Sequence, residues 1–216
     1  MRKTSYVVTF ILVAAILSLN VVSIKRDDWL VIKLPEILWT KTTLTYGLAS
    51  RCELIETRLP EPGSDNEITR RSYNCRKFPI DVQDKCDSEK RAFCAEWTSA
   101  GYIDQVAIGF GAVSLLAILF GVTTHSRRRR IWKAVAWLVF LQALLQITAF
   151  SIITHNYETV NLFEQARLGT GYVLNILSWI FGLFITAGVI VTGMAADSGH
   201  RWAAGNRAYR RISGGQ

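Results

Sequence analysis

Residues 168–196 read LGTGYVLNILSWIFGLFITAGVIVTGMAA, a run without a single charged side chain. About 20 consecutive apolar residues are enough for a helix to cross a hydrocarbon core of about 30 Å. Three other apolar runs meet this length, so we expect spans at 5–24, 101–124, 131–154 and 168–196. The chain of 216 residues is 50% hydrophobic and only 19% charged. This pattern excludes a soluble enzyme or a nucleic-acid-binding domain, although the net charge is +8.

Basic residues indicate which connecting segments lie inside the cell, because an excess of Lys and Arg marks the cytoplasmic side. The N-terminus 1–4, the loop 125–130 and the tail 197–216 are rich in basic residues. The segment 25–100 has 13 basic and 13 acidic residues, and the short loop 155–167 has one Arg and two Glu. We therefore expect a membrane protein with both termini inside and two loops outside. The basic loop contains Arg127, Arg128, Arg129 and Arg130, which anchor the topology and can attract anionic lipids.

The first apolar run has an alternative interpretation as a secretory signal peptide, because Arg2 and Lys3 precede it. The run is longer than the ~7–15 residues of a signal core, and no clear A-x-A cleavage site follows it. Cleavage would leave three spans and an outside N-terminus. A retained first span is the favoured interpretation.

The segment 25–100 is long enough to form a small domain. Residues 29–34 form a short apolar run, and apolar and polar residues alternate from Leu44 to Leu54, which predicts one strand with a buried face. Turn-forming residues at 60–66 precede a partner strand over 68–75, and 84–97 has a helical composition. The predicted fold is an all-α membrane protein, a left-handed bundle of four transmembrane helices with a small disulfide-stapled extracellular antiparallel β-sheet.

All four cysteines lie in this segment, and their even number on the oxidising side predicts two disulfides. Their spacing does not fit a zinc site. Of the three possible pairings we expect Cys52–Cys75 and Cys86–Cys94. If Cys52 and Cys75 face each other across an antiparallel hairpin, apolar and oppositely charged pairs also align, namely Leu54 with Tyr73, Leu59 with Ile68, and Glu56 with Arg71. The second bridge requires a turn near 87–88, because eight positions along a helix span about 12 Å.

Four residues of the outside segment carry a resemblance to a known family. Trp29, Gly47, Leu48 and Cys52 follow the claudin-type signature W-x(n)-G-L-W-x-x-C, which a second cysteine follows. With the four-span layout, the chain resembles the claudin and peripheral-myelin-protein superfamily, or its fungal relatives, the PalI-like and eisosome-type proteins. Ala49 stands where the family has a second Trp, and the next cysteine comes later than in the family. These departures suggest a divergent branch without tight-junction sealing.

Small and polar residues mark one face of the fourth span. Gly171, Ser178 and Gly182 share this face, which can serve a homo-oligomer seam or, as we favour, packing within the bundle. Asp104 is expected at the headgroup level, at the start of the second span. Gln142 and Gln146 are expected to make hydrogen bonds between helices.

The sequence predicts a protein without enzymatic activity. The three histidines fall in separate loops, and no catalytic or phosphate-binding motif is present, so we expect no cofactor, metal or small-molecule substrate. The resemblance implies a structural or organising protein of the plasma membrane. It would assemble laterally in the lipid bilayer, with itself or with other membrane proteins, and act through contacts of its outside domain. A regulatory subunit or sensor of another membrane protein is the alternative, and an ion pathway is less favoured.

Overall fold

The fold is described from a computed structural model. The structure describes residues 3–37, 39–60, 67–80, 83–84, 86, 90–123, 128–200 and 203.

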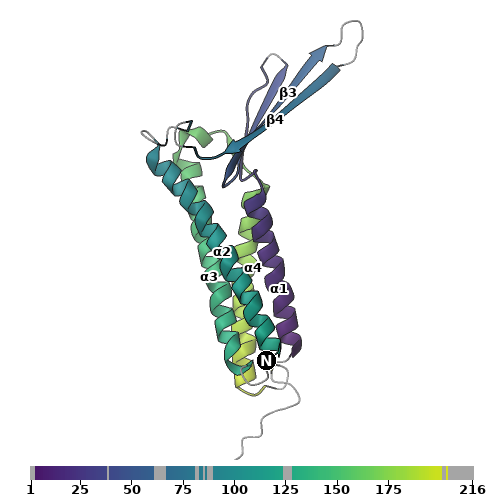
Figure 1. The fold of residues 1–216 in the computed structure, drawn as a ribbon, viewed down its shortest axis with the longest axis vertical. Coiled ribbons are helices and arrows are strands. Elements are labelled where there is room, and N and C mark those ends of the chain that lie inside the picture. The colour runs from purple at the N-terminus through teal and green to yellow at the C-terminus, as the bar shows by residue number, and fades with distance from the viewer. Residues whose placement is uncertain are drawn as a thin grey trace, which may run out of the picture. The chain divides into compact units, whose positions relative to one another are not determined.

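Four helices form the apolar part of the protein: α1 (Lys3–Lys25), α2 (Arg91–Thr123), α3 (Arg128–Thr159) and α4 (Thr170–Asp197) (Figure 1). Each is long and apolar enough to cross a membrane, which agrees with the four predicted spans. α2 begins at Arg91, so the helix expected within 84–97 and the second span are one continuous helix.

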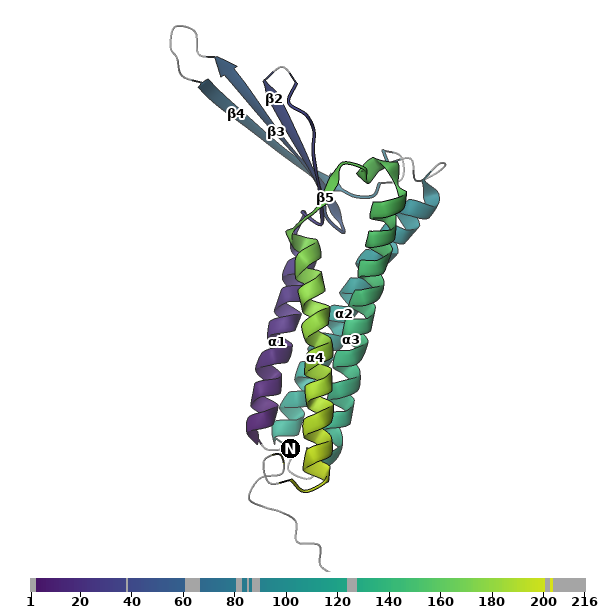
Figure 2. The ribbon, with the colours of Figure 1, turned by 180° about the vertical axis from the view of Figure 1, so that it is seen from behind.

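Within the described residues, five strands form one antiparallel sheet, in the order β4-β3-β2-β1-β5. They are β1 (Leu30–Lys33), β2 (Thr40–Tyr46), β3 (Ser50–Pro60), β4 (Glu67–Lys77) and β5 (Ala166–Leu168). Figure 2 shows β5, which comes from the segment between α3 and α4 and pairs with β1. The sequence analysis did not predict this fifth strand.

The single strand expected from Leu44 to Leu54 is wrong. The chain turns between β2 and β3, where the Gly47 N–H donates to the Ser50 carbonyl at 2.8 Å, and Leu44 pairs with Glu53. Leu48 lies in the turn and is nevertheless buried. Leu48 also continues the alternation of apolar residues Leu44, Tyr46 and Leu48 in the sequence, which is why the pattern read as one strand.

The hairpin of β3 and β4 has the register that the sequence predicts. Cys52 faces Cys75, and the other three expected pairs also align, namely Leu54 with Tyr73, Glu56 with Arg71, and Leu59 with Ile68. A 2.9 Å ion pair joins Arg71 to Glu56. Disulfides join Cys52 to Cys75 and Cys86 to Cys94, which are the two expected pairs. The predicted turns at 61–66 and 87–88 lie outside the described residues.

The chain forms two compact units, which are described separately. The sheet unit contains Leu19–Gln105 and Leu145–Leu177, and the bundle unit contains Met1–Ser18, Val106–Leu144 and Ser178–Gln216. Two of the predicted packing residues lie in the bundle unit. The Ser178 hydroxyl donates to the Ile16 carbonyl at 3.0 Å, and a Cβ at Gly182 would lie 3.3 Å from Ala143. Both contacts are made within the bundle.

Candidate functional site

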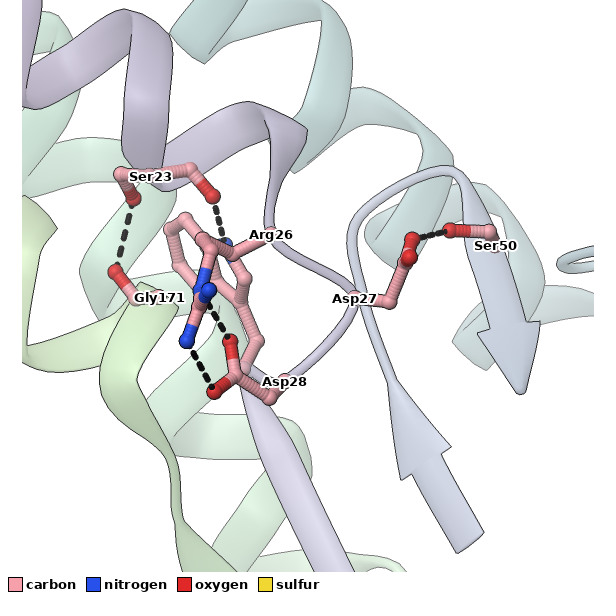
Figure 3. Close-up of polar contacts among 7 residues, drawn as sticks. Ser23, Arg26, Asp27, Asp28, Ser50 and Gly171 are labelled. Atoms are coloured by element: carbon pink, nitrogen blue, oxygen red, sulfur yellow. Dashed lines mark hydrogen bonds and ion pairs between the residues drawn. The ribbon is translucent and has the colours of Figure 1, made fainter. Parts of the chain in front are cut away.

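The first part of the site is a junction around Trp29, where α1 passes into β1. Trp29 is fully buried, and its indole Nε1–H donates to the Ser23 carbonyl at 2.8 Å. The Ser23 hydroxyl in turn donates to the Gly171 carbonyl at 2.7 Å, in the first turn of α4 (Figure 3). The tryptophan of the signature therefore links the end of α1 to the start of α4.

Two glycines permit this close approach. The Gly169 N–H donates to the Trp29 carbonyl at 2.8 Å, and a Cβ at Gly169 would lie 1.8 Å from the Asp28 carbonyl oxygen. A Cβ at Gly171 would lie 2.5 Å from Cδ1 of Trp29. Gly171, which the sequence placed on a helix-packing face, packs against this indole. Neither position has space for a larger residue.

The Gly47–Leu48 turn is fixed from two sides. A Cβ at Gly47 would lie 2.9 Å from the Cα of Asp27, whose carboxylate accepts a hydrogen bond from the Ser50 hydroxyl (Figure 3). The Gly47 carbonyl accepts a 3.2 Å hydrogen bond from Nε1 of Trp97, in α2. The turn therefore joins the sheet to α2, and the signature residues Trp29, Gly47 and Leu48 are all buried in one unit with Cys52.

An aromatic cluster fills the space between the sheet and the helices. The rings of Trp97 and Phe163 stack with centroids 5.5 Å apart, and Tyr46 contacts Phe78 and Phe163 edge to face. Burial raises the pKa of the Tyr46 hydroxyl, although the Arg51 guanidinium, 5.2 Å from the ring centroid, acts to lower it. Phe163 comes from the segment before β5, so this segment also supplies a core residue.

An ion pair joins the end of β4 to the segment before Cys86. The Arg76 guanidinium contacts both carboxylate oxygens of Asp84, at 2.5 and 2.7 Å, and the Ile80 N–H donates to the same carboxylate at 2.8 Å. Burial acts to raise the pKa of Asp84, but the hydrogen bonds from Arg76 and Ile80 outweigh it and hold the pKa below its usual value.

The second part of the site is a polar group among the helices of the sheet unit. Asp104 of α2 is completely buried within the protein, and its expected position at the headgroup level stays a prediction. The Asn175 side-chain nitrogen lies 3.4 and 3.3 Å from the two carboxylate oxygens of Asp104. The Asn20 amide, from α1, lies beside the same carboxyl group, although within the described residues neither of its side-chain polar atoms makes a hydrogen bond. The sequence analysis singled out neither asparagine for this site.

The two predicted glutamines are both buried in α3. Within the described part of the chain the Gln142 amide has no hydrogen-bond partner, so the expected hydrogen bond between helices is not formed there. Gln142 instead packs against Gly111, where a Cβ would lie 2.9 Å from its Oε1. Its role is to fill space beside a glycine of α2.

Two further sequence expectations concern ions and lipids. Asp27, Cys52 and Cys75 lie close enough together to suggest a metal site, but the two cysteines share a disulfide, and the metal ligand is the thiolate. Arg127 and the side chains of Arg128, Arg129 and Arg130 lie outside what the structure describes.

Comparison with known proteins assigns no family to the chain. A scan of protein-family models gives no match, and a search of curated proteins gives none either. The structure itself defines the class: a protein with four candidate membrane spans and a small disulfide-bonded antiparallel sheet.

Proposed function

We propose that this chain is a non-enzymatic organising protein of the plasma membrane, of claudin-like type, that acts by lateral assembly and through contacts of its outside sheet. The observation that carries the proposal is the open edge of β4. β4 is an outermost strand in the sheet order, and its residues 69–75 are exposed. An outermost strand offers unpaired N–H and C=O groups to a second chain.

The geometry of the hairpin specifies which groups face the open edge. The Cα atoms of Cys52 and Cys75 are 4.1 Å apart, the short separation of a pair that exchanges no backbone hydrogen bonds. The backbone groups of Cys75, and by alternation those of Tyr73 and Arg71, therefore point away from β3. Tyr73 adds a side chain that is 64% exposed to the same edge.

Two other observations support the proposal. Large aromatic side chains of the helices are exposed, among them Phe120 and Phe184, as expected of surfaces that contact lipid. The signature residues Trp29, Gly47 and Leu48 are buried where the sheet meets the helices, which suits a shared fold rather than a variable binding surface.

The test is a pair of substitutions at one position. Tyr73→Pro removes an N–H that points to the open edge and leaves the hydrogen bonds to β3 in place, because proline is tolerated on outermost strands. Tyr73→Ala removes the side chain alone and is the matched control. Native detergent extracts should show a ladder of assemblies for the wild type and for Tyr73→Ala, and a loss of the larger species for Tyr73→Pro.

Two outcomes contradict the proposal. An unchanged ladder for Tyr73→Pro would remove the β4 edge from the interface. A single stoichiometric band that contains a different membrane protein would favour the alternative function, a regulatory subunit. Non-reducing peptide mapping of the Cys52–Cys75 pair in each variant verifies that the hairpin has formed.

A further inference from the structure

Asp104 has no basic partner within the apolar helices. It is the one charged residue between 97 and 124, and the runs 5–24, 134–154 and 168–196 contain no charged residue. A buried carboxyl group needs either a counter-charge or a proton, because an unpaired charge away from water is strongly unfavourable. A charged residue at such a place in a membrane protein commonly marks a functional site. The side chains of these helices do not supply that counter-charge.

The two asparagines leave their hydrogen-bonding capacity unused. Asn20 is completely buried, and within the described residues neither its Nδ2 nor its Oδ1 forms a hydrogen bond. Asn175 is also completely buried, its Oδ1 has no partner among the described residues, and its two contacts to Asp104 are long. Buried amides are normally hydrogen-bonded, so two incompletely bonded amides against one carboxylate call for an explanation.

Together these three side chains can provide four oxygen ligands. Rotation of an asparagine amide by 180° exchanges its nitrogen and its oxygen at little steric cost. With both amide oxygens turned inward, Asn20 and Asn175 each add one ligand to the two carboxylate oxygens of Asp104. Carboxylate and amide oxygens are the ligands that hard cations prefer.

The three residues come from three different helices, all within the sheet unit. Asn20 lies one turn before Ser23 in α1, and Asn175 lies one turn after Gly171 in α4. Ser23 and Gly171 are joined by the hydrogen bond of the Trp29 junction. Asp104 lies one turn after Gly101, where a Cβ would lie 3.5 Å from the Leu48 carbonyl. Each of the three polar residues therefore lies one helical turn away from a residue that contacts the sheet or the Trp29 junction.

We propose that Asp104, Asn20 and Asn175 form a binding site for a monovalent alkali cation that holds α1, α2 and α4 together. One positive charge balances the single carboxylate, whereas a divalent ion would leave an excess positive charge in a buried place. A bound cation would balance the charge of the carboxylate and coordinate both amide oxygens at the same time. This site is separate from the β4 edge. The cation-site proposal can therefore be refuted without refuting the proposed function, and the reverse also holds.

The test is thermal unfolding of the purified full chain in detergent, in NaCl, KCl or N-methylglucamine chloride at equal ionic strength. Na⁺ or K⁺ should raise the unfolding midpoint by about 3–6 °C for each tenfold increase in concentration above the dissociation constant, and N-methylglucamine should not. Asp104→Asn should abolish the difference between the salts. Glu158→Gln removes one exposed charge from α3 and is the matched control, which should retain the difference.

A second variant keeps the carboxylate, so the proposal can still be tested if the Asp104→Asn protein does not fold. Asn20→Ala removes one ligand oxygen and should raise the concentration for the half-maximal effect at least about tenfold. Equal midpoints in all three salts would overturn the proposal. So would a midpoint that rises with falling pH and is indifferent to Na⁺ and K⁺, because a proton would then neutralise Asp104.

Discussion

Substitution of Gly169 by alanine should disrupt the contact between β1 and the start of α4. The new Cβ would lie 1.8 Å from the Asp28 carbonyl oxygen, and the obstructing atom is backbone, so no side chain can rotate away to relieve the clash. A normal contact requires the two segments to move apart by about 1.5 Å, judged from ordinary carbon–oxygen van der Waals distances. The 2.8 Å hydrogen bond from the Gly169 N–H to the Trp29 carbonyl cannot survive that movement.

The magnitude follows from the contacts that are lost. The hydrogen bond from Gly171 N–H to the Asp28 carbonyl, at 3.3 Å, lies in the same segment and should also break. Two net hydrogen bonds contribute about 2 kcal/mol, and forced repacking adds about 1–3 kcal/mol. Alanine reduces the entropy of the unfolded chain and offsets about 0.4–1 kcal/mol. We expect Gly169→Ala to lower the free energy of unfolding by about 2–4 kcal/mol.

The assay compares Gly169→Ala with Gly188→Ala by thermal unfolding in detergent. Gly188 lies in α4, where a Cβ would have no atom within 4 Å, so this control should be neutral or slightly stabilising. Gly169→Ala should lower the midpoint by about 5–15 °C for a chain of this size. Equal midpoints for the two variants would refute the reasoning, because they would show that the Asp28–Trp29 backbone before β1 does not meet the backbone at Gly169.

Three further predictions concern the sheet unit. Trp29→Phe keeps most of the ring but removes the donor to the Ser23 carbonyl, and should cost about 1–3 kcal/mol in denaturant unfolding; a loss below about 0.5 kcal/mol would exclude a structural role for that bond. The ion pair between Arg76 and Asp84 holds the carboxyl pKa below its unfolded value, so its stabilisation is present above about pH 4 and is lost as the pH falls through the folded pKa. Asp84→Asn should lower the unfolding midpoint at pH 7 and reduce the further loss on acidification, and an unchanged pH dependence would contradict this. Removal of the Cys52–Cys75 disulfide should lower the free energy of unfolding by about 3 kcal/mol. The measurement compares the variant in which both cysteines are replaced by serine with the wild type.

The features that the sequence predicted correctly are local ones. The register of β3 with β4 depends on residues at most 27 positions apart, from Ser50 to Lys77, and several aligned pairs agree on it. Each apolar span can likewise be recognised from its own composition. Such features can be predicted without information about the position of the rest of the chain.

The missed features depend on distant segments. β5 has three residues and forms because β1 offers a partner more than a hundred positions earlier in the chain. The sequence carries no strand pattern long enough to reveal it. The turn at Gly47 was missed for a different reason, since Leu48 is held in the core by packing between the sheet and α2 rather than by its place in a strand. Glycines that allow such packing are visible in the sequence, but the backbone that approaches them is not.

The surroundings of Asp104 depend on distant segments and were not predicted from the sequence. The sequence analysis began the second span at residue 101, so Asp104 fell within the first turn of that span, where contact with headgroups or water is inexpensive. α2 instead begins at Arg91, and its first three turns pack against the sheet and the aromatic cluster through Phe93 and Trp97. Asp104 is therefore in the fourth turn of α2, on its buried face, and the polar side chains beside it are Asn20 and Asn175 on two other helices. A carboxylate in that position requires compensation for its charge, and this requirement, rather than any motif, identifies it as a candidate site.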